Sequence, residues 1–373
     1  MIVSEKWLRP LTISVLLIFL VCFVLRPEAS YAAALRGLSL WWQVIAPALL
    51  PFFIFSELLL ELGLATYMGP LLSRLMRPLF ALPGSAALGV ALGFCSGFPT
   101  GGAIAASLRQ KNAISREQGE RLVAFTNNAG PLYVTVSVAT GLLHCPKAAF
   151  ILAIAHYGAN LFLGMIMGLV SRWRGQNQTM QVTLPPSAAV ETSSFGKALR
   201  QSAERAANNI LLVGCYMVFF STVASFWEEL FTTMPPLVHS LLLGSLEMSL
   251  GVNALAGSGL PLTEILPWCA ALLSFGGLSV ISQVMAMIAD TDIRPRLYLL
   301  CRFLQAGLSF LFTKIFLAVI TLPASTISRP EGQFSFVCFN WAICALVLLP
   351  GVLEFLYTKS LLFGKTKNSR PNG

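Results

Sequence analysis

The feature that most constrains this chain is a series of long apolar runs separated by short charged connections. Two of these runs, at about residues 122–143 and 148–170, are close to the roughly 20 residues that a helix needs to cross a bilayer. Charged residues make up only 11% of the chain, against about 25% in soluble domains. Because a bilayer offers the backbone no water to bind, such runs form helices. The sequence therefore predicts an all-α polytopic membrane protein.

We predict about eight spanning helices and two further apolar segments that enter and leave the membrane on one side. The spans lie at about residues 11–25, 38–62, 122–143, 148–170, 209–226, 265–289, 299–322 and 334–356, and the two further segments at about 84–108 and 238–260. The first run, which follows Lys6 and Arg9, also has the form of a cleaved signal peptide. The many later spans favour an uncleaved signal-anchor helix.

The positions of lysine and arginine distinguish two arrangements of these segments. If 84–108 and 238–260 are re-entrant, the basic stretches 109–121 and 171–205 lie in the cytoplasm together with the C-terminal tail, as the positive-inside rule requires. If both segments crossed the membrane, the two basic stretches would move outside. We therefore predict two re-entrant broken-helix segments in an inverted repeat, with both termini in the cytoplasm.

The first re-entrant segment contains the motif 93–103, which carries four glycines, a proline and two hydroxyl groups within an apolar run. Proline removes a backbone donor and glycine adds backbone freedom, so a continuous helix is not expected here. Inside a membrane, non-helical backbone is tolerated where protein buries it or where it lines a water-filled cavity, and transporters place solute sites there. The candidate binding residues are Ser96, Gly97, Pro99, Thr100 and Gly101. Close helix packing along the glycines is the alternative.

Other polar residues at membrane depth extend the predicted site. Glu247 is a candidate because a carboxylate inside a membrane is costly, and it serves either to bind a cation or proton or to cap a broken helix. Lys314, well inside a predicted span, is expected to pair with Glu247 or to neutralise an anionic solute. The remaining candidates lie beside glycine breaks or in the second re-entrant segment: Asn127, Asn128, Asn253, Gly276, Gly277, Ser279 and Gln283. Hydrogen bonding between helices is the alternative role for these neutral groups.

The sequence lacks the residues that several other classes of protein need for their function. The formal net charge is +9, but the basic residues form no single patch, so no nucleic acid partner is predicted. The eight cysteines include no C-x-x-C pair and there are three histidines, so we predict no metal site and no cofactor. The sequence contains no Walker loop and no nucleophile elbow, so an enzyme is not expected. The expected partners are the lipid bilayer and a small anionic solute.

Three motifs resemble the nucleoside-recognition (Gate-domain) membrane family, and within it a group of stage V sporulation integral membrane proteins. They are Gly93-x-x-Ser96-Gly97-x-Pro99-x-Gly101, Glu247-x-x-x-Gly251 and Ser274-Phe275-Gly276-Gly277-Leu278-Ser279-Val280. The resemblance covers about residues 35–320. It implies two Gate repeats and a role in endospore formation, with import of dipicolinic acid, a flat aromatic dicarboxylate, across the outer forespore membrane.

On this basis we divide the chain into a signal-anchor helix (1–34), a first Gate-type repeat (35–170), a basic cytoplasmic loop (171–207), a second repeat (208–322) and a C-terminal helix with a basic tail (323–373). A transporter of nucleosides or other small metabolites is the alternative function, and a membrane scaffold for spore assembly is the second alternative. A scaffold is expected to carry a large soluble domain, which no predicted loop is long enough to form. The sequence leaves the coupling ion and the oligomeric state open.

Overall fold

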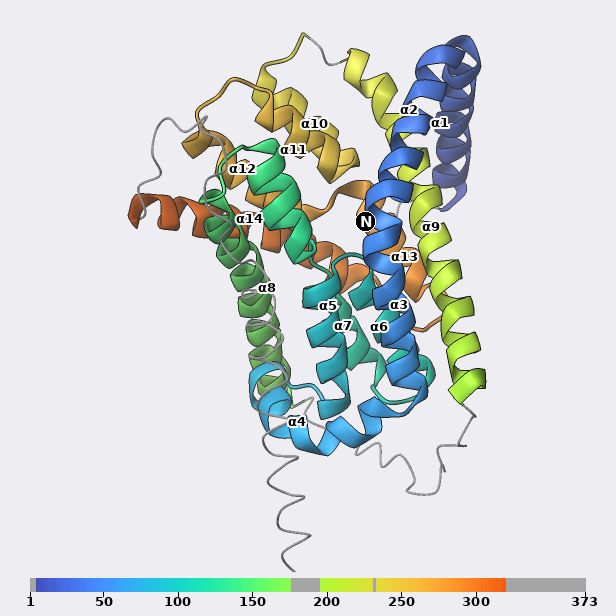
Figure 1. The fold of residues 1–373 in the computed structure, drawn as a ribbon, viewed down its shortest axis with the longest axis vertical. Coiled ribbons are helices and arrows are strands. Elements are labelled where there is room, and N and C mark those ends of the chain that lie inside the picture. The colour runs from blue at the N-terminus through green and yellow to red at the C-terminus, as the bar shows by residue number, and fades with distance from the viewer. Residues whose placement is uncertain (1–4, 176–194, 231–232, 320–373) are drawn as a thin grey trace, which may run out of the picture.

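A computed structural model describes residues 5–175, 195–230 and 233–319 of the chain (Figure 1). Every regular element in these ranges is a helix. The helices are α1 (Glu5–Leu25), α2 (Pro27–Leu40), the π-helix η1 (Trp41–Ile45), α3 (Ala46–Glu61), α4 (Leu64–Phe80), the short 3₁₀-helix η2 (Gly84–Ala86), α5 (Ala87–Ser96), α6 (Thr100–Gln110), α7 (Arg116–Thr126), the π-helix η3 (Tyr133–Leu142), α8 (Ala148–Trp173), α9 (Phe195–Leu230), α10 (Pro236–Leu246), α11 (Met248–Ala256), α12 (Leu262–Phe275), α13 (Gly277–Ile288) and α14 (Arg296–Val319).

Four helices are long and apolar enough to cross a membrane: α8, most of α9 (Phe195–Glu228), α12 together with α13 (Leu262–Ile288), and α14. Two further pairs of helices meet at sharp bends, of 108° between α1 and α2 and of 89° between the end of α4 and the segment Gly84–Ser96. Counting each bent pair as one span raises the number to six. The described part of the chain thus supports four to six spans, fewer than the eight or so predicted. The predicted last span, 334–356, lies outside the described residues.

The predicted span at 122–143 is not one helix. α7 begins at Arg116, because Ser115 and Gln118 form a capping box: the Ser115 hydroxyl accepts from the Gln118 backbone N–H, and the Gln118 side chain accepts from the Ser115 backbone N–H. The helix ends before residues 127–130, which are non-helical and precede η3. The predicted start of this span was therefore wrong, since the capping box begins the helix at Arg116, whereas the glycine break predicted beside Asn127 and Asn128 is present.

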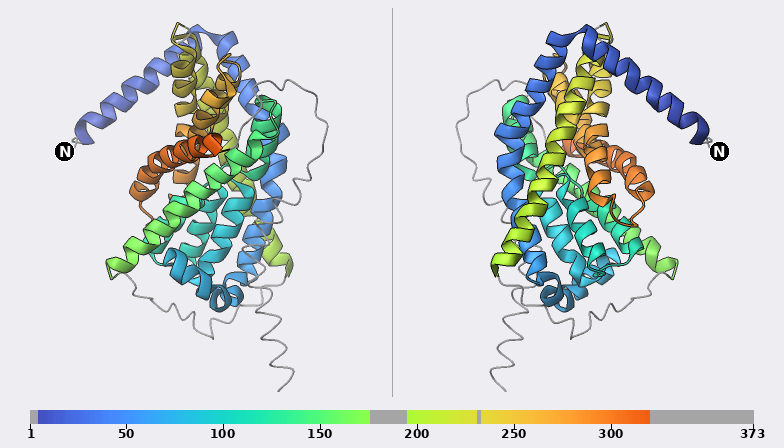
Figure 2. Two further views of the ribbon diagram at one scale, coloured as in Figure 1. Left: turned by 90° about the vertical axis from the view of Figure 1, so that its left-hand side faces the viewer. Right: turned by 90° about the vertical axis from the view of Figure 1, so that its right-hand side faces the viewer.

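Three helices form a layer at one side of the molecule. α9 packs along both α2 and α3, which follow one another end to end beside it in Figure 1. Leu49 and Phe53 of α3 share a buried apolar cluster with Ile210 and Val213 of α9. α1 leans away from this layer as a projecting arm (Figure 2).

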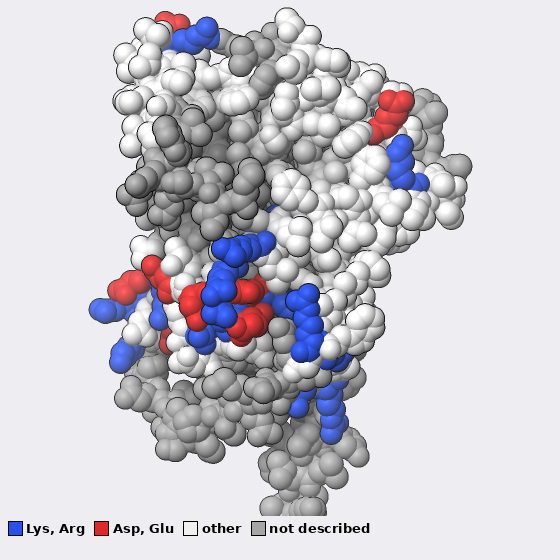
Figure 3. All heavy atoms as spheres, turned by 180° about the vertical axis from the view of Figure 1, so that it is seen from behind, with Lys and Arg blue, Asp and Glu red and all other residues white. Residues whose placement is uncertain are grey.

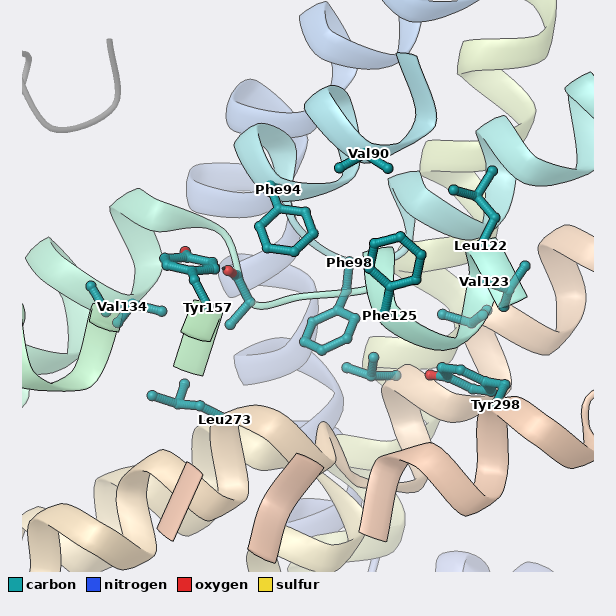
Figure 4. Packing of buried hydrophobic residues seen from close by; sticks show 14 of the residues in the cluster. Val90, Phe94, Phe98, Leu122, Val123, Phe125, Val134, Tyr157, Leu273 and Tyr298 are labelled. Atoms are coloured by element: carbon teal, nitrogen blue, oxygen red, sulfur yellow. Dashed lines mark hydrogen bonds between the residues drawn. The ribbon is translucent and has the colours of Figure 1, made fainter. Parts of the chain in front are cut away.

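The remaining helices share a large apolar core whose centre is aromatic. Phe94 of α5, Phe125 of α7 and Tyr157 of α8 lie close together, with Phe98 beside them between α5 and α6 (Figure 4). The rings of Phe94 and Tyr157 are 5.9 Å apart, and Phe80 of α4 stacks on Phe125 at a centroid distance of 4.9 Å. These contacts hold α5, α7 and α8 together around the segment that interrupts α5 and α6.

Charged side chains gather toward the end of the molecule at which α4 lies crosswise, and much of the surface above them is uncharged (Figures 1 and 3). Two arginines close the C-terminus of α4: Arg121 donates to the Ala81 carbonyl oxygen at 2.8 Å, and Arg172 donates to carbonyl oxygens of the last turn. Arg109 at the end of α6 forms an ion pair of 2.8 Å with Asp292 in the connection between α13 and α14. The hydrogen bond from Arg109 holds the pKa of Asp292 below its usual range.

Candidate solute-binding site

Two helical hairpins and two broken helices meet in the body of the molecule. α5 and α6 form the first hairpin, interrupted at residues 97–99, and α10 and α11 form the second, interrupted at Glu247. α7 ends before the non-helical residues 127–130. α12 gives way to α13 at Gly276 and Gly277, whose φ angles are 84° and 75°. Each interruption releases backbone groups from the helical hydrogen-bond pattern.

Glycine lets these interruptions approach one another closely. A Cβ atom at Gly97 would lie 2.6 Å from the backbone nitrogen of Gly130, and one at Gly277 would lie 2.9 Å from the carbonyl oxygen of Gly244. Phe98, at the tip of the first hairpin, reaches the second broken helix, because a Cβ atom at Gly276 would lie 3.5 Å from its ring. The four interruptions therefore form one region. We call it the break centre and define it by residues 96–100, 127–130, 246–247 and 276–277.

The predicted hydroxyl and amide groups of the first half are all buried at the break centre. Asn127 has a structural role: its Oδ1 accepts from the backbone N–H of Gly102 at 2.9 Å, and its Nδ2 donates to a carbonyl of α7 at 2.7 Å. In contrast, neither side-chain atom of Asn128 has a hydrogen-bond partner among the described residues, and the same holds for the hydroxyls of Ser96 and Thr100. A buried polar atom without a partner costs about 1–3 kcal/mol. These atoms therefore favour a site that takes up water or a polar solute.

Two of the other predicted residues, Pro99 and Gly101, shape the backbone around this site. Gly101 lets α6 approach α7, since a Cβ atom there would lie 2.6 Å from the Thr126 carbonyl oxygen, and Pro99 precedes the first turn of α6. Ser279 and Gln283 lie buried on α13, where the Gln283 amide donates to the Ser279 hydroxyl at 3.3 Å. The structure thus buries the predicted residues of α13 but pairs them with each other.

Glu247 caps the start of α11. One carboxylate oxygen accepts from the backbone N–H groups of Ser249 at 2.8 Å and Leu250 at 3.1 Å, and the other accepts from the Ser249 hydroxyl at 3.2 Å. The side chain is buried. Of the roles considered for this carboxylate, the structure provides the geometry of a helix cap.

Glu247→Ala is expected to lower the free energy of unfolding by about 1–2 kcal/mol, because two N–H groups at the start of α11 lose their acceptor. Glu247→Gln is the matched control, since it keeps an acceptor oxygen at the same place. The thermal unfolding midpoint in detergent measures both variants. Equal loss in the two would show that the negative charge matters rather than the cap.

Two predicted residues lie away from the break centre. Asn253 is exposed and lines a separate cavity of about 440 Å³ together with Glu228 and His239. Lys314 is also exposed, and its Nζ lies 5.9 Å from the centre of the Phe310 ring on the same helix. The structure does not pair Lys314 with Glu247, whose carboxylate is bound to the start of α11.

The buried cation of this region is Arg302 of α14, which the sequence reasoning missed. Its side chain is fully buried and donates to three carbonyl oxygens, those of Asn127 at 2.8 Å, Ser274 at 3.0 Å and Ala124 at 3.2 Å. Gln305, one turn further along, donates to the same Ala124 oxygen at 3.0 Å. Arg302 therefore connects the C-terminal ends of α7 and α12, just where both helices are interrupted.

A periodic pattern in α14 would have revealed this residue. Polar side chains recur at helical spacing, and all four are buried: Arg302, Gln305, Ser309 and Thr313. Large apolar side chains of the same helix, such as Leu304 and Leu311, are exposed. α14 thus turns its polar face inward and its apolar face outward, which is the reverse of a helix on a soluble protein. In the sequence, Arg302 lies at the end of a charged connection and near the start of the predicted span 299–322, so its charge did not mark it as a buried residue.

A second group of buried polar residues continues from Ser274. His156 of α8 accepts from the backbone N–H of Ala129 through Nε2 at 3.1 Å, so a neutral ring carries its proton on Nδ1. Nδ1 lies 2.7 Å from the Ser274 hydroxyl, which in turn lies 2.6 Å from the Ser309 hydroxyl. This chain of hydrogen bonds fixes α8, α12 and α14 relative to residues 127–130.

An ion cluster attaches the layer of α3 and α9 to the first hairpin. Glu57 of α3 is buried and accepts from the Ser107 hydroxyl at 2.9 Å and from Arg205 of α9 at 3.2 Å. Glu61 accepts from the same guanidinium at 3.1 Å and from Lys111 at 3.0 Å. In the sequence, the two carboxylates lie four residues apart near the end of a predicted span, a position that favours a solvated face. Only the tertiary structure shows that α6 and α9 enclose them.

The described helices, four to six of which are candidate spans, make this an all-α integral membrane protein. Residues 42–173, from η1 to the end of α8, match the family model described as "Nucleoside recognition" (Gate). The chain is 32% identical over 362 residues to the sporulation integral membrane protein YlbJ of Bacillus subtilis (strain 168), covering 89% of this chain and 88% of that protein. It therefore belongs to the family of YlbJ-like sporulation integral membrane proteins. No solved structure shows a significant match to the chain.

Proposed function

We propose that this protein is a transporter, and not an enzyme, that moves dipicolinic acid across the outer forespore membrane during endospore formation. The solute binds at the break centre, and no cofactor takes part. The relative that defines the family is named for sporulation, which supports the proposed cellular setting. The chemical argument comes from the break centre itself.

The observation that carries the proposal is the set of buried polar atoms without partners around interrupted helices. Ser96, Thr100 and Asn128 present hydroxyl and amide groups that no described residue satisfies. Such groups in the core of a membrane protein favour a solute site over a purely structural core. An aromatic dicarboxylate fits this setting, because its carboxylate oxygens accept from hydroxyl and amide donors while its ring lies against Phe98 and other apolar groups.

The arrangement of the two halves supports an inverted repeat. In the first half the hairpin α5–α6 packs on the interruption after α7, and in the second half the hairpin α10–α11 packs on the interruption between α12 and α13. We propose that the first hairpin opens to the cytoplasm and the second to the opposite side, with both termini cytoplasmic, an orientation that the distribution of basic residues supports. Alternating access would then exchange the break centre between the two sides.

Two alternative functions would use the protein differently. A nucleoside or another small metabolite would use the same neutral donors and acceptors, without a need for positive charge nearby. A membrane scaffold for spore assembly would use helix faces and would move no solute.

Uptake into proteoliposomes tests the proposal. The purified protein is expected to accumulate labelled dipicolinate saturably, and empty liposomes give the background. Labelled uridine serves as the nucleoside probe, and each uptake is repeated with an imposed pH or sodium gradient to identify coupling. Uptake of uridine alone would favour the nucleoside alternative, and uptake of neither solute would favour the scaffold.

A further inference from the structure

The side chain of Arg302 carries a positive charge into the core, with no carboxylate among its hydrogen-bond partners in the described part of the chain. These partners are carbonyl oxygens. A guanidinium keeps its charge at any physiological pH, and removing that charge from water is costly unless other groups stabilise it. The groups that stabilise Arg302 therefore indicate the role of its charge.

Two helix ends supply part of the stabilisation. The carbonyl oxygens of Ala124 and Asn127 lie at the C-terminus of α7, and that of Ser274 lies at the C-terminus of α12. The C-terminus of a helix carries roughly half a negative charge. The two helix ends hold the guanidinium in place. Their partial negative charges belong to fixed backbone dipoles, so they do not supply a counter-ion. The Nε–H group of Arg302 is left without a partner among the described residues.

The guanidinium binds the break centre next to a residue with unsatisfied side-chain atoms. The carbonyl that Arg302 binds at 2.8 Å belongs to the peptide group between Asn127 and Asn128, and Asn128 is the residue whose side-chain amide has no partner. The guanidinium also lies 5.7 Å from the ring of Phe98, at the tip of the first hairpin. Arg302 thus approaches the break centre from α14 at the point where the first hairpin meets it.

We propose that Arg302 is the specificity-determining residue of the solute site, and that its charge selects a carboxylate over an uncharged solute of the same shape. This inference rests on the proposed solute site at the break centre. Near a buried cation in a low-dielectric core, a carboxylate gains attraction that a carboxamide does not. Arg302 also positions the ends of α7 and α12, so charge and position have to be separated by experiment.

The test compares dipicolinate with its uncharged diamide, which has nearly the same shape. The readout is the ratio of acid to diamide, measured by uptake into proteoliposomes and by the rise of the thermal unfolding midpoint on binding. We expect Arg302→Gln to lower this ratio roughly ten- to hundredfold, as for loss of an interaction with a charged group. Arg302→Lys keeps the charge and is expected to retain most of the preference although it loses the planar fork.

Two further variants keep the test decisive if Arg302→Gln fails to fold. Asn128→Asp is nearly isosteric and places a carboxylate on the residue that shares the peptide group bound by Arg302, so it is expected to lower the ratio by offsetting the charge. Lys314→Ala is the matched control, because it removes an exposed cation from the same helix, and we expect an unchanged ratio. An unchanged ratio in Asn128→Asp, or equal losses for acid and diamide in Arg302→Lys and Arg302→Gln, would overturn the inference and leave Arg302 as a structural link.

Failure of the proposed function gives a different result. If the wild-type protein takes up neither compound but is stabilised more by the acid than by the diamide, and Arg302→Gln removes this difference, transport is wrong and the role of Arg302 holds. A wild-type protein that shows no preference for the acid in either measurement overturns the inference, whether or not solute crosses the membrane.

Discussion

Gly251→Ala is expected to lower the free energy of unfolding by about 3 kcal/mol and to abolish uptake, because the second hairpin cannot close around an added methyl group. A Cβ atom at Gly251 would lie 2.6 Å from the backbone nitrogen of Gly244 and 2.8 Å from the carbonyl oxygen of Ser240. All of these neighbours are backbone atoms of α10, which cannot rotate away as a side chain can. The thermal unfolding midpoint in detergent and dipicolinate uptake measure the two effects.

Gly307→Ala is the matched control for this substitution. Gly307 lies on α14, and a Cβ atom there would meet nothing within 4 Å. Since alanine favours a helix over glycine by up to about 1 kcal/mol, the midpoint is expected to stay the same or to rise. If Gly251→Ala behaved like Gly307→Ala, the close packing of α10 on α11 would not be needed for the fold.

Arg205→Ala is expected to lower the free energy of unfolding by about 2 kcal/mol, because it leaves the Glu57 carboxylate buried without its cation. The side chain of Glu57 is 3% exposed and that of Arg205 is 44% exposed. Solvent screening of the arginine reduces the effect below the 3–5 kcal/mol or so that breaking a fully buried pair costs. Unfolding in detergent by heat or denaturant measures the difference.

An exposed pair on the same helix provides the control. Arg200 and Glu204 of α9 form an ion pair of 3.3 Å with side chains 77% and 60% exposed. Arg200→Ala is therefore expected to change stability by no more than about 0.5 kcal/mol. Adding Glu57→Gln to Arg205→Ala should recover part of the loss, since a neutral amide needs no counter-ion. Equal effects of Arg200→Ala and Arg205→Ala would contradict a role for the ion cluster in attaching α9 to α6.

Local chemistry made some of the fold predictable. The interruptions at residues 97–99 and at Gly276 and Gly277 were expected, because glycine and proline act on the backbone of their own segment. The all-α membrane class and membership of the Gate type were likewise predicted from the chain, and the comparison with known proteins confirms them. The start of the predicted span at 122–143 was wrong because hydropathy does not register the capping box that begins α7 at Arg116.

The sequence by itself determined that the chain is an integral membrane protein, where two of its helices break, and which family it belongs to. The tertiary structure decided which charged side chains face inward: Arg302 and Glu57 are buried, and Lys314 is exposed. The physical reason is that lipid and protein core are both apolar, so hydropathy gives the length of a membrane helix but not the direction in which each face points. Only the packing of α14 against α7 and α12 brings Arg302 to two helix ends that lie far from it in the sequence.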